Sequence, residues 1–280
     1  MTNAESERGF VLVPAVWLAG IIGIALSVFL TEISLDIRLR ANLVENTRAE
    51  LLADGMARQL ALEIAAGPGV ALSIAEAPHE CRLDAEFSAI FKVQDQSGLV
   101  DLNAASAITL RELVRVLNVD LAPAHVFADR ILDFRDKDDS PQPKGAELPE
   151  YRDAKSDQHP KNRPFEHISE LDQVLGMNEN LRKLLYDKVT VYSGQDGIDP
   201  RVAPVELKSS DESKFPVNVS QQQSFAIDVL VFRREGAGFH RRAIIRVLRR
   251  PERPFAILEW ETGDADATAQ LRQAPHKYCS

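Results

Sequence analysis

The chain is short of the residues that most catalytic and metal-cluster motifs need. Among its 280 residues are two cysteines, Cys81 and Cys279, which cannot form the disulfide framework of a small secreted domain. They could pair with each other in an oxidising compartment, but Cys279 is one residue from the C-terminus, so a free thiol fits the sequence equally well. The six histidines stand at no recognisable catalytic spacing, and a glycine-rich phosphate loop is missing. These absences argue against an enzyme.

Positive charge is also in short supply. Lys and Arg number 33 against 42 Asp and Glu, which gives a formal net charge of −9. An acidic protein repels phosphate, so the composition argues against a nucleic-acid surface.

One stretch has no charge at all. The 21 residues from Phe10 to Leu30 are uncharged, and as a helix they would span about 30 Å, the thickness of a bilayer core. The run is too long for the apolar part of a secretory signal peptide, and in its leader Glu5 and Glu7 outnumber Arg8. The sequence therefore predicts a single N-terminal membrane anchor.

The chain has no helix breaker just after this run. Gly and Pro are absent from Thr31 to Asp54, and apolar residues recur at helical spacing as far as Ile64. We therefore expect one helix from Phe10 to Ala66, about 85 Å long, that turns amphipathic in its second half. Pro14 should bend or loosen its first turns.

The remainder predicts a soluble head of mixed structure. Residues 87–94 alternate like a strand and lead through Ser97-Gly98 into what resembles a hairpin. Helical periodicity follows, with stripes that include Leu110, Phe127, Ile168 and Leu181. Three strands are expected over 225–232, 243–248 and 255–260, with the charged residues around their first turn at a solvated edge.

The expected fold is thus α+β: a long N-terminal transmembrane and amphipathic helix, then an antiparallel β domain with a large helical insert. All apolar core segments should lie beyond Gly69, so that this head folds without the helix. The expected divisions are a leader (1–9), membrane helix (10–30), amphipathic helix (31–67), first strands (80–101), helical insert (102–190), connector (191–222) and C-terminal strands with a tail (223–280).

A long acidic segment interrupts the insert. Residues 136–164 carry five prolines and seven Asp or Glu and show no periodicity, as in a functional loop. Hard oxygen ligands of this kind suit calcium, although the spacing is not that of an EF-hand. The simpler reading is a solvated loop neutralised by nearby Lys and Arg residues, among them Arg135. The candidate calcium ligands are Asp133, Asp136, Asp138, Asp139 and Glu147.

Several motifs together resemble a known family. A short polar leader ending in Arg8-Gly9, then Phe10 and an apolar helix, resembles the type IV prepilin-like proteins. The segments "GLVDLNAAS", "ILDFRDKDD", "GAE", "NRPFEHISELDQVLGM" and "VTVYSG" follow in the order found in the type II secretion minor pseudopilin K (GspK) family. Most prepilin-like proteins have Glu at the fifth mature position; this chain has Pro14, and the K family also lacks that Glu.

The resemblance implies how the chain is processed and where it works. A prepilin peptidase would cut between Gly9 and Phe10 and methylate the new N-terminus. The protein would sit in the inner membrane by a single span, with its N-terminus cytoplasmic and its head periplasmic. It would stand at the tip of the pseudopilus with other minor pseudopilins and the major pseudopilin, and take part in protein export across the outer membrane. Some pseudopilins of this kind bind calcium.

A membrane-anchored DNA-binding or DNA-uptake protein is the alternative. Residues 102–131 and 164–177 also resemble paired helix-hairpin-helix units. Such hairpins need glycines where backbone amides approach a phosphate, yet residues 118–121 contain none and the second hairpin has only Gly176. Residues 101–188 carry 17 acidic and 13 basic side chains, a net of −4, which is the wrong sign for DNA.

Overall fold

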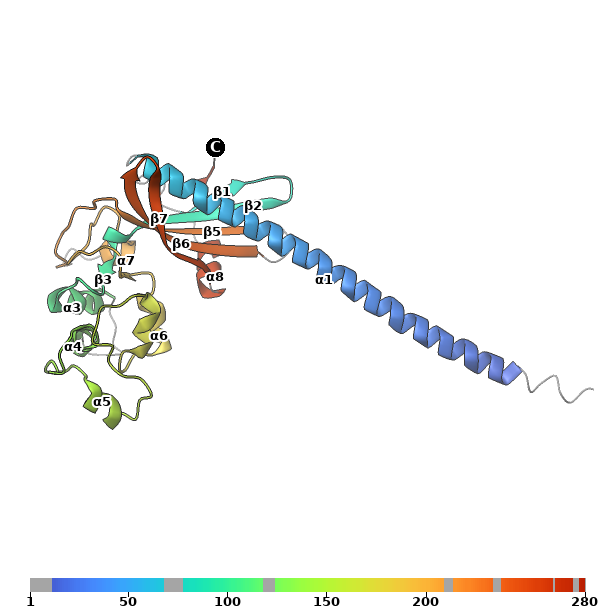
Figure 1. Ribbon diagram of the computed structural model, residues 1–280, viewed down its shortest axis with the longest axis horizontal. Helices are drawn as coiled ribbons and strands as arrows, with labels where there is room; N and C mark the ends of the chain where they lie inside the picture. The colour runs from blue at the N-terminus through green and yellow to red at the C-terminus, as the bar shows by residue number, and fades with distance from the viewer. Residues whose placement is uncertain are drawn as a thin grey trace, which may run out of the picture. The chain divides into compact units, whose positions relative to one another are not determined.

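The computed structural model describes residues 12–67, 78–117, 124–208, 214–233, 238–263, 265–273 and 277–279. The chain divides into two compact units, Met1–Leu51 and Leu52–Ser280. The long helix α1 (Leu12–Ala66) contributes to both of them (Figure 1).

Helix α1 confirms the prediction of one continuous N-terminal helix. It ends at Ala66, immediately before Gly67. Pro14 is accommodated because it lies in the first turn, where a backbone N–H has no intrahelical partner to lose. Residues Pro14–Thr31 have a mean hydropathy of 2.0 and are not buried, so length and composition make this segment a candidate membrane span.

The second half of α1 belongs to the core of the head. Five apolar side chains at helical spacing are buried in it: Ala53, Ala57, Leu60, Ala61 and Ile64. Asp54 Oδ1 accepts a hydrogen bond from Arg241 Nε at 2.6 Å, and the Arg58 guanidinium lies 4.7 Å from the Trp260 ring. The expectation that the whole core lies beyond Gly69 is therefore wrong, because the sheet needs this helix to cover one of its faces.

The main sheet has six strands in the order β7-β6-β5-β2-β1-β8. Neighbouring strands are antiparallel except for β1 and β8, which are parallel. The central strand β5 is buried along eight consecutive residues, which explains its nearly uninterrupted apolar sequence. The strands are β1 (His79–Arg82), β2 (Phe87–Asp95), β5 (Ser224–Arg233), β6 (Gly238–Arg250), β7 (Arg253–Thr262) and β8 (Lys277–Tyr278).

Strand β6 shows how the two faces of the sheet are used. Successive side chains point to opposite faces. Arg241 reaches Asp54 of α1, whereas His240 Nδ1 lies 3.0 Å from Thr268 Oγ1 of α8 (Ala265–Gln273). Helices α1 and α8 thus cover opposite faces. Arg241 is buried and Arg242 is nearly so, which corrects the expectation of a solvated edge, because β6 is paired on both sides.

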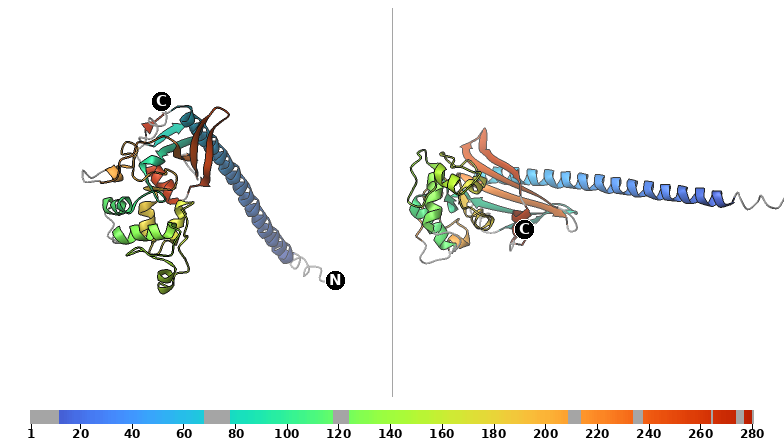
Figure 2. Two further views of the ribbon diagram at one scale, coloured as in Figure 1. Left: turned by 60° about the vertical axis from the view of Figure 1, so that its left-hand side comes forward. Right: turned by 90° about the horizontal axis from the view of Figure 1, so that it is seen from below.

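The predicted helical insert lies between β2 and β5. A two-stranded parallel sheet of β3 and β4 brings its two ends together, and its helices lie beside one another in all views (Figures 1 and 2). The elements are η1 (Gln96–Gly98), β3 (Val100–Asp101), α3 (Ala107–Val116), α4 (Ala124–Arg135), α5 (Leu148–Asp153), the 3-10 helix η2 (Ile168–Gln173), α6 (Glu179–Leu185) and β4 (Val189–Thr190).

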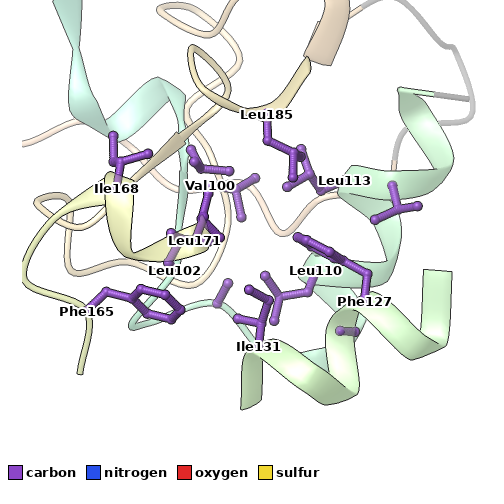
Figure 3. Packing of buried hydrophobic residues seen from close by; sticks show 14 of the residues in the cluster. Val100, Leu102, Leu110, Leu113, Phe127, Ile131, Phe165, Ile168, Leu171 and Leu185 are labelled. Atoms are coloured by element: carbon purple, nitrogen blue, oxygen red, sulfur yellow. The ribbon is translucent and has the colours of Figure 1, made fainter. Parts of the chain in front are cut away.

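The insert has a hydrophobic core of its own. The expected stripes meet there: Leu110 and Leu113 of α3 face Phe127 and Ile131 of α4, and Leu171 comes from η2 (Figure 3). The connector contributes as well, since Leu207 of α7 (Val205–Lys208) and Phe215 belong to the same cluster. The connector is therefore part of the insert's packing.

One local expectation about residues 87–101 is wrong, and the state of the two cysteines, which the sequence left open, is resolved. The predicted hairpin after β2 is wrong: β2 pairs with β1 and β5, and β3 pairs in parallel with β4. The turn at Ser97-Gly98 instead sends the chain into the insert, and Gly98 is required because a Cβ there would lie 2.4 Å from the Val202 carbonyl oxygen.

Cys81 and Cys279 form a disulfide, which ties β1 to the C-terminal segment.

Candidate metal centre

The candidate acidic residues occupy the end of α4 and the loop after it. Asp133 is in the last turn of α4, Asp136 follows that helix directly, and Glu147 is the N-cap residue of α5. Asp138 and Asp139 lie between them in the loop. All five residues thus lie at the end of α4 or on the connection from α4 to α5, but they differ in burial and in hydrogen bonding.

Asp133 is completely buried and organises the loop around itself. Its two carboxylate oxygens each accept a hydrogen bond from the Gln142 backbone N–H, at 3.1 Å. A Cβ on Gly145 would lie 1.8 Å from Asp133 Oδ2, so only glycine allows the loop to close over this carboxylate. Burial, with the charges of Asp136 and Asp129 adding to it, raises the pKa of Asp133.

Glu147 and Asp136 have buried carboxylate oxygens without a hydrogen-bond partner among the described residues. Glu147 is 1% exposed, and its side chain faces the backbone N–H of Glu150 in a capping box, but neither carboxylate oxygen makes a hydrogen bond of normal geometry to a described residue. Asp136 Oδ1 is in the same condition. Burial, followed by the charges of Asp133 and Asp136, raises the pKa of Glu147 to about 7. Buried polar atoms are nearly always paired, so three such oxygens on neighbouring carboxylates indicate a place for a cation or a proton.

The other two carboxylates point outward. Asp138 Oδ1 accepts from the Ser140 N–H at 2.9 Å, and Asp139 Oδ1 accepts from Asn162 Nδ2 at 3.0 Å. Both residues are exposed. They shape the loop and add negative charge, but each side chain already accepts a hydrogen bond from another residue of the loop region.

The basic residues expected to neutralise this loop make no close ion pair with it. Arg135 directs its guanidinium to the backbone carbonyls of Leu102 and Ala105, although its charge still acts against the rise in the pKa of Asp136. Lys137, Lys144 and Arg152 are exposed, and within the described ranges no ion pair joins any of these four cations to the five carboxylates. The reading of a loop neutralised by its own Lys and Arg stays a prediction, with the charge of Arg135 in its favour.

Sequence reasoning missed one acidic residue here. Asp129 lies one turn before Asp133 on α4 and is 3% exposed. It accepts hydrogen bonds from Arg111 Nη2 and from the Lys144 backbone N–H, both at 3.1 Å. The i,i+4 spacing of Asp129 and Asp133 was the available signal. Because Asp129 accepts hydrogen bonds from Arg111 and from the Lys144 backbone N–H, it fixes the loop to α3 and α4 and is not a further unsatisfied carboxylate.

Among the described residues of the acidic loop, no three carboxylates place one oxygen each within 4.8 Å of one another, so the loop as it stands is wider than a closed metal site. Across the described residues, the one group of three or more possible ligands whose atoms all lie within 4.8 Å is His167, Glu259 and Glu261, elsewhere in the head. The predicted processing site, Arg8, Gly9 and Phe10, lies outside the described residues.

The possible DNA hairpins do not gain support from the fold. Residues 118–121 lie outside the described ranges. Gly176 has a φ of +82°, but Arg130 Nη1 lies 2.1 Å from where its Cβ would be and donates to the Leu175 carbonyl at 2.7 Å. This turn is therefore covered by a side chain of its own domain.

Comparisons with known proteins point to one class. Residues 90–194 match the family described as Type II secretion system (T2SS), protein K. Among solved structures, the chain is similar to one in the GspK-GspI-GspJ complex from the Type 2 Secretion System of enterotoxigenic Escherichia coli. That likeness has a TM-score of 0.59 at 19% sequence identity and covers 81% of this chain and 100% of the other. No curated protein matches the chain in sequence.

Proposed function

We propose that this chain is a protein K of the type II secretion system, the minor pseudopilin at the tip of the pseudopilus. It would take part there in pseudopilus assembly and in protein export across the outer membrane. The observation that carries the proposal is the helical insert. The matched residues 90–194 begin in β2 and run through β4, so the family signature covers the added domain itself. The role is structural: a place in an assembly.

Two features of the chain support a position at the tip. In prepilin-like proteins the Glu at the fifth mature position is thought to meet the N-terminal amine of the neighbouring subunit ahead. A topmost subunit has no such neighbour, and here Pro14 stands at that position. The insert, with a separate hydrophobic core, adds bulk to the head that would block another subunit from stacking above it.

The proposed partners are other minor pseudopilins and, below them, the major pseudopilin. The similar solved chain comes from a complex with GspI and GspJ, which supports partners of those two kinds. We expect the I-type and J-type proteins of the same host to co-purify with this chain from membranes. Recovery of this chain alone, under conditions where the other two associate with each other, would contradict the proposal.

The proposed processing follows from the N-terminal residues. A prepilin peptidase would remove residues 1–9 and methylate Phe10, leaving the apolar first part of α1 as a single inner-membrane span with the head in the periplasm. Intact-mass measurement of the membrane form should show the loss of Met1 to Gly9 and the gain of one methyl group. An intact leader in cells with an active peptidase would refute this step.

We further propose that the acidic loop binds calcium. The buried unsatisfied oxygens of Asp136 and Glu147 fit a hard cation, and Asp133 lies beside them. These three side chains would hold the ion, and Asp138 and Asp139 would add to the negative potential. Calcium would neutralise the buried charge and fix the loop between α4 and α5.

The calcium proposal makes a thermal prediction. A ligand that binds only the folded state stabilises it by about 2.7 kcal/mol at a hundredfold excess over Kd. That corresponds to a rise in Tm of about 5–10 °C for a head of this size. After chelation, added calcium should produce this rise in Tm and added magnesium should not, since magnesium requires a nearly octahedral arrangement of ligands. Asp136→Asn should reduce the rise, whereas Asp153→Asn, an exposed aspartate on α5, should leave it unchanged.

The secretion role is tested separately. A host strain lacking this chain should lose export of its type II substrates, and the full chain supplied from a plasmid should restore it. A deletion of the insert that keeps the sheet and α1 should be processed and inserted but should not restore export. Normal export without the chain would overturn the function, whatever the outcome of the calcium experiment.

A further inference from the structure

A second group of possible ligands joins the insert to the edge of the main sheet. His167 lies just before η2, and Glu259 and Glu261 lie on β7. One ligand atom from each of the three lies within 4.8 Å of the other two. Within this group, His167 Nδ1 and Glu259 Oε1 are 2.8 Å apart.

The local fold explains why the two glutamates point the same way. Strand residues two apart share a face. Trp260, between them, lies on the opposite face beneath Arg58 of α1. Glu259 and Glu261 therefore both face the insert, where Glu261 is exposed and the Glu259 side chain is 10% exposed. His167 is half-exposed, so an ion could reach the group from solvent.

Both acidic and basic side chains surround the group, and the charge of Arg242 acts on both glutamates. The Tyr192 hydroxyl donates to Glu259 Oε1, and burial together with that bond and the charges of both glutamates raises the pKa of Tyr192. The nearest guanidinium across the strand pair, Arg242, is 3.4 Å from both oxygens of Asp228. Glu261 has no ion-pair partner among the residues that the structure describes.

We propose that His167, Glu259 and Glu261 bind a first-row divalent metal ion of the zinc type. An imidazole with two carboxylates is a donor set suited to zinc and less suited to calcium, which takes oxygen ligands. Tetrahedral zinc with bonds of about 2.0–2.1 Å places its ligand atoms about 3.3 Å apart. Atoms that already lie within 4.8 Å reach that spacing by small rotations of the exposed His167 and Glu261 side chains around the more buried Glu259.

Such an ion would join two parts of the head that are far apart in sequence. His167 belongs to the insert and the glutamates to the last long strand. The polar bonds described between these residues and the insert run from His167 and from Tyr192 to Glu259. Zinc would replace the direct bond between His167 and Glu259 by coordination from both. The site is separate from the acidic loop and does not depend on the proposed place of the chain in a pseudopilus.

The test uses the full chain in detergent, without a polyhistidine tag, after removal of metals by a chelator. Calcium is then supplied in millimolar excess so that the acidic loop does not take up zinc. Titration calorimetry with Zn²⁺ should show one site per chain. Glu261→Gln should weaken zinc binding by about tenfold or more, while the bond between His167 and Glu259 stays intact. His167→Ala should weaken it at least as much.

Two matched variants separate a built site from general surface binding. His159→Ala removes another exposed histidine of the insert, and Glu252→Gln removes another exposed glutamate near β7. Both should bind zinc as the parent does. Cu²⁺ bound to the parent should show coupling to one imidazole nitrogen in its electron paramagnetic resonance spectrum, and this coupling should vanish in His167→Ala. Absence of zinc binding, or equal binding by the parent, Glu261→Gln and His167→Ala, would overturn the proposal.

Discussion

Replacing Asp228 with Asn should destabilise the head and remove part of its response to acid. Asp228 lies on the central strand β5 and is 9% exposed. Arg242 Nη1 is 3.4 Å from each of its carboxylate oxygens, and His240 Nε2 is 3.1 Å from Oδ1. Burial alone would raise the pKa of Asp228, but the Arg242 charge and the His240 contact outweigh it and lower the pKa to about 2.

The magnitude follows from proton linkage. A fall in pKa from 3.8 to about 2 in the folded state corresponds to about 2.5 kcal/mol of stability, at about 1.4 kcal/mol per pH unit. Because the folded pKa is below the unfolded one, the unfolded chain binds more protons between these values. The contribution is therefore complete above pH 4 and is lost as the pH falls towards 2. Asp228→Asn lacks it at every pH.

The assay is urea unfolding of a protein that begins at Leu52, in which Trp260 is the single tryptophan. At neutral pH, Asp228→Asn should lose about 2.5 kcal/mol, or about 5–10 °C in Tm. The difference from the parent should shrink as the pH is lowered from 4 towards 2. Asp157→Asn, an exposed aspartate, serves as the control. Equal stabilities for the two variants, or a difference that does not change with pH, would refute the reasoning.

Three further outcomes are expected. Gly145→Ala should cost about 1–3 kcal/mol, measured by thermal melting, because its Cβ would meet Asp133 Oδ2 at 1.8 Å; a melting curve like that of the parent would contradict the loop closure. Replacing Cys81 and Cys279 by Ser should lower the free energy of unfolding by up to about 5 kcal/mol, which is the chain-entropy value for a loop with a separation of 198 residues. An unchanged free energy of unfolding under non-reducing conditions would argue against the disulfide. A protein that begins at Gly69 should be at least about 5 kcal/mol less stable than one that begins at Leu52, since it loses the apolar face of α1; equal denaturation midpoints would show that this face is dispensable.

The sequence was sufficient wherever the signal was local and periodic. The charge-free run and the absence of Gly and Pro after it determined α1, since helix formation depends on neighbours three and four residues apart. The stripe of Leu110 and Leu113 and the strand pattern of 225–232 identified real elements for the same reason. The cluster of acidic residues after α4 was visible as composition alone.

Tertiary structure decided what depends on contacts between distant segments. The pairing of β2 with β5 replaced the expected hairpin, because strand partners are chosen by packing over more than a hundred residues. Arg241 and Arg242 became buried because Asp54 and Asp228 reach them from α1 and β5.

The acidic loop and the group around His167 also depend on contacts that the sequence does not reveal. The sequence offered five equivalent carboxylates in the acidic loop, and only burial separated Asp133, Asp136 and Glu147 from the two that face solvent. Nothing in the sequence singled out His167, because its carboxylate neighbours lie 92 residues and more away in the chain. Local patterning thus fixes the elements, whereas burial and the electrostatics that follow from it are properties of the assembled fold.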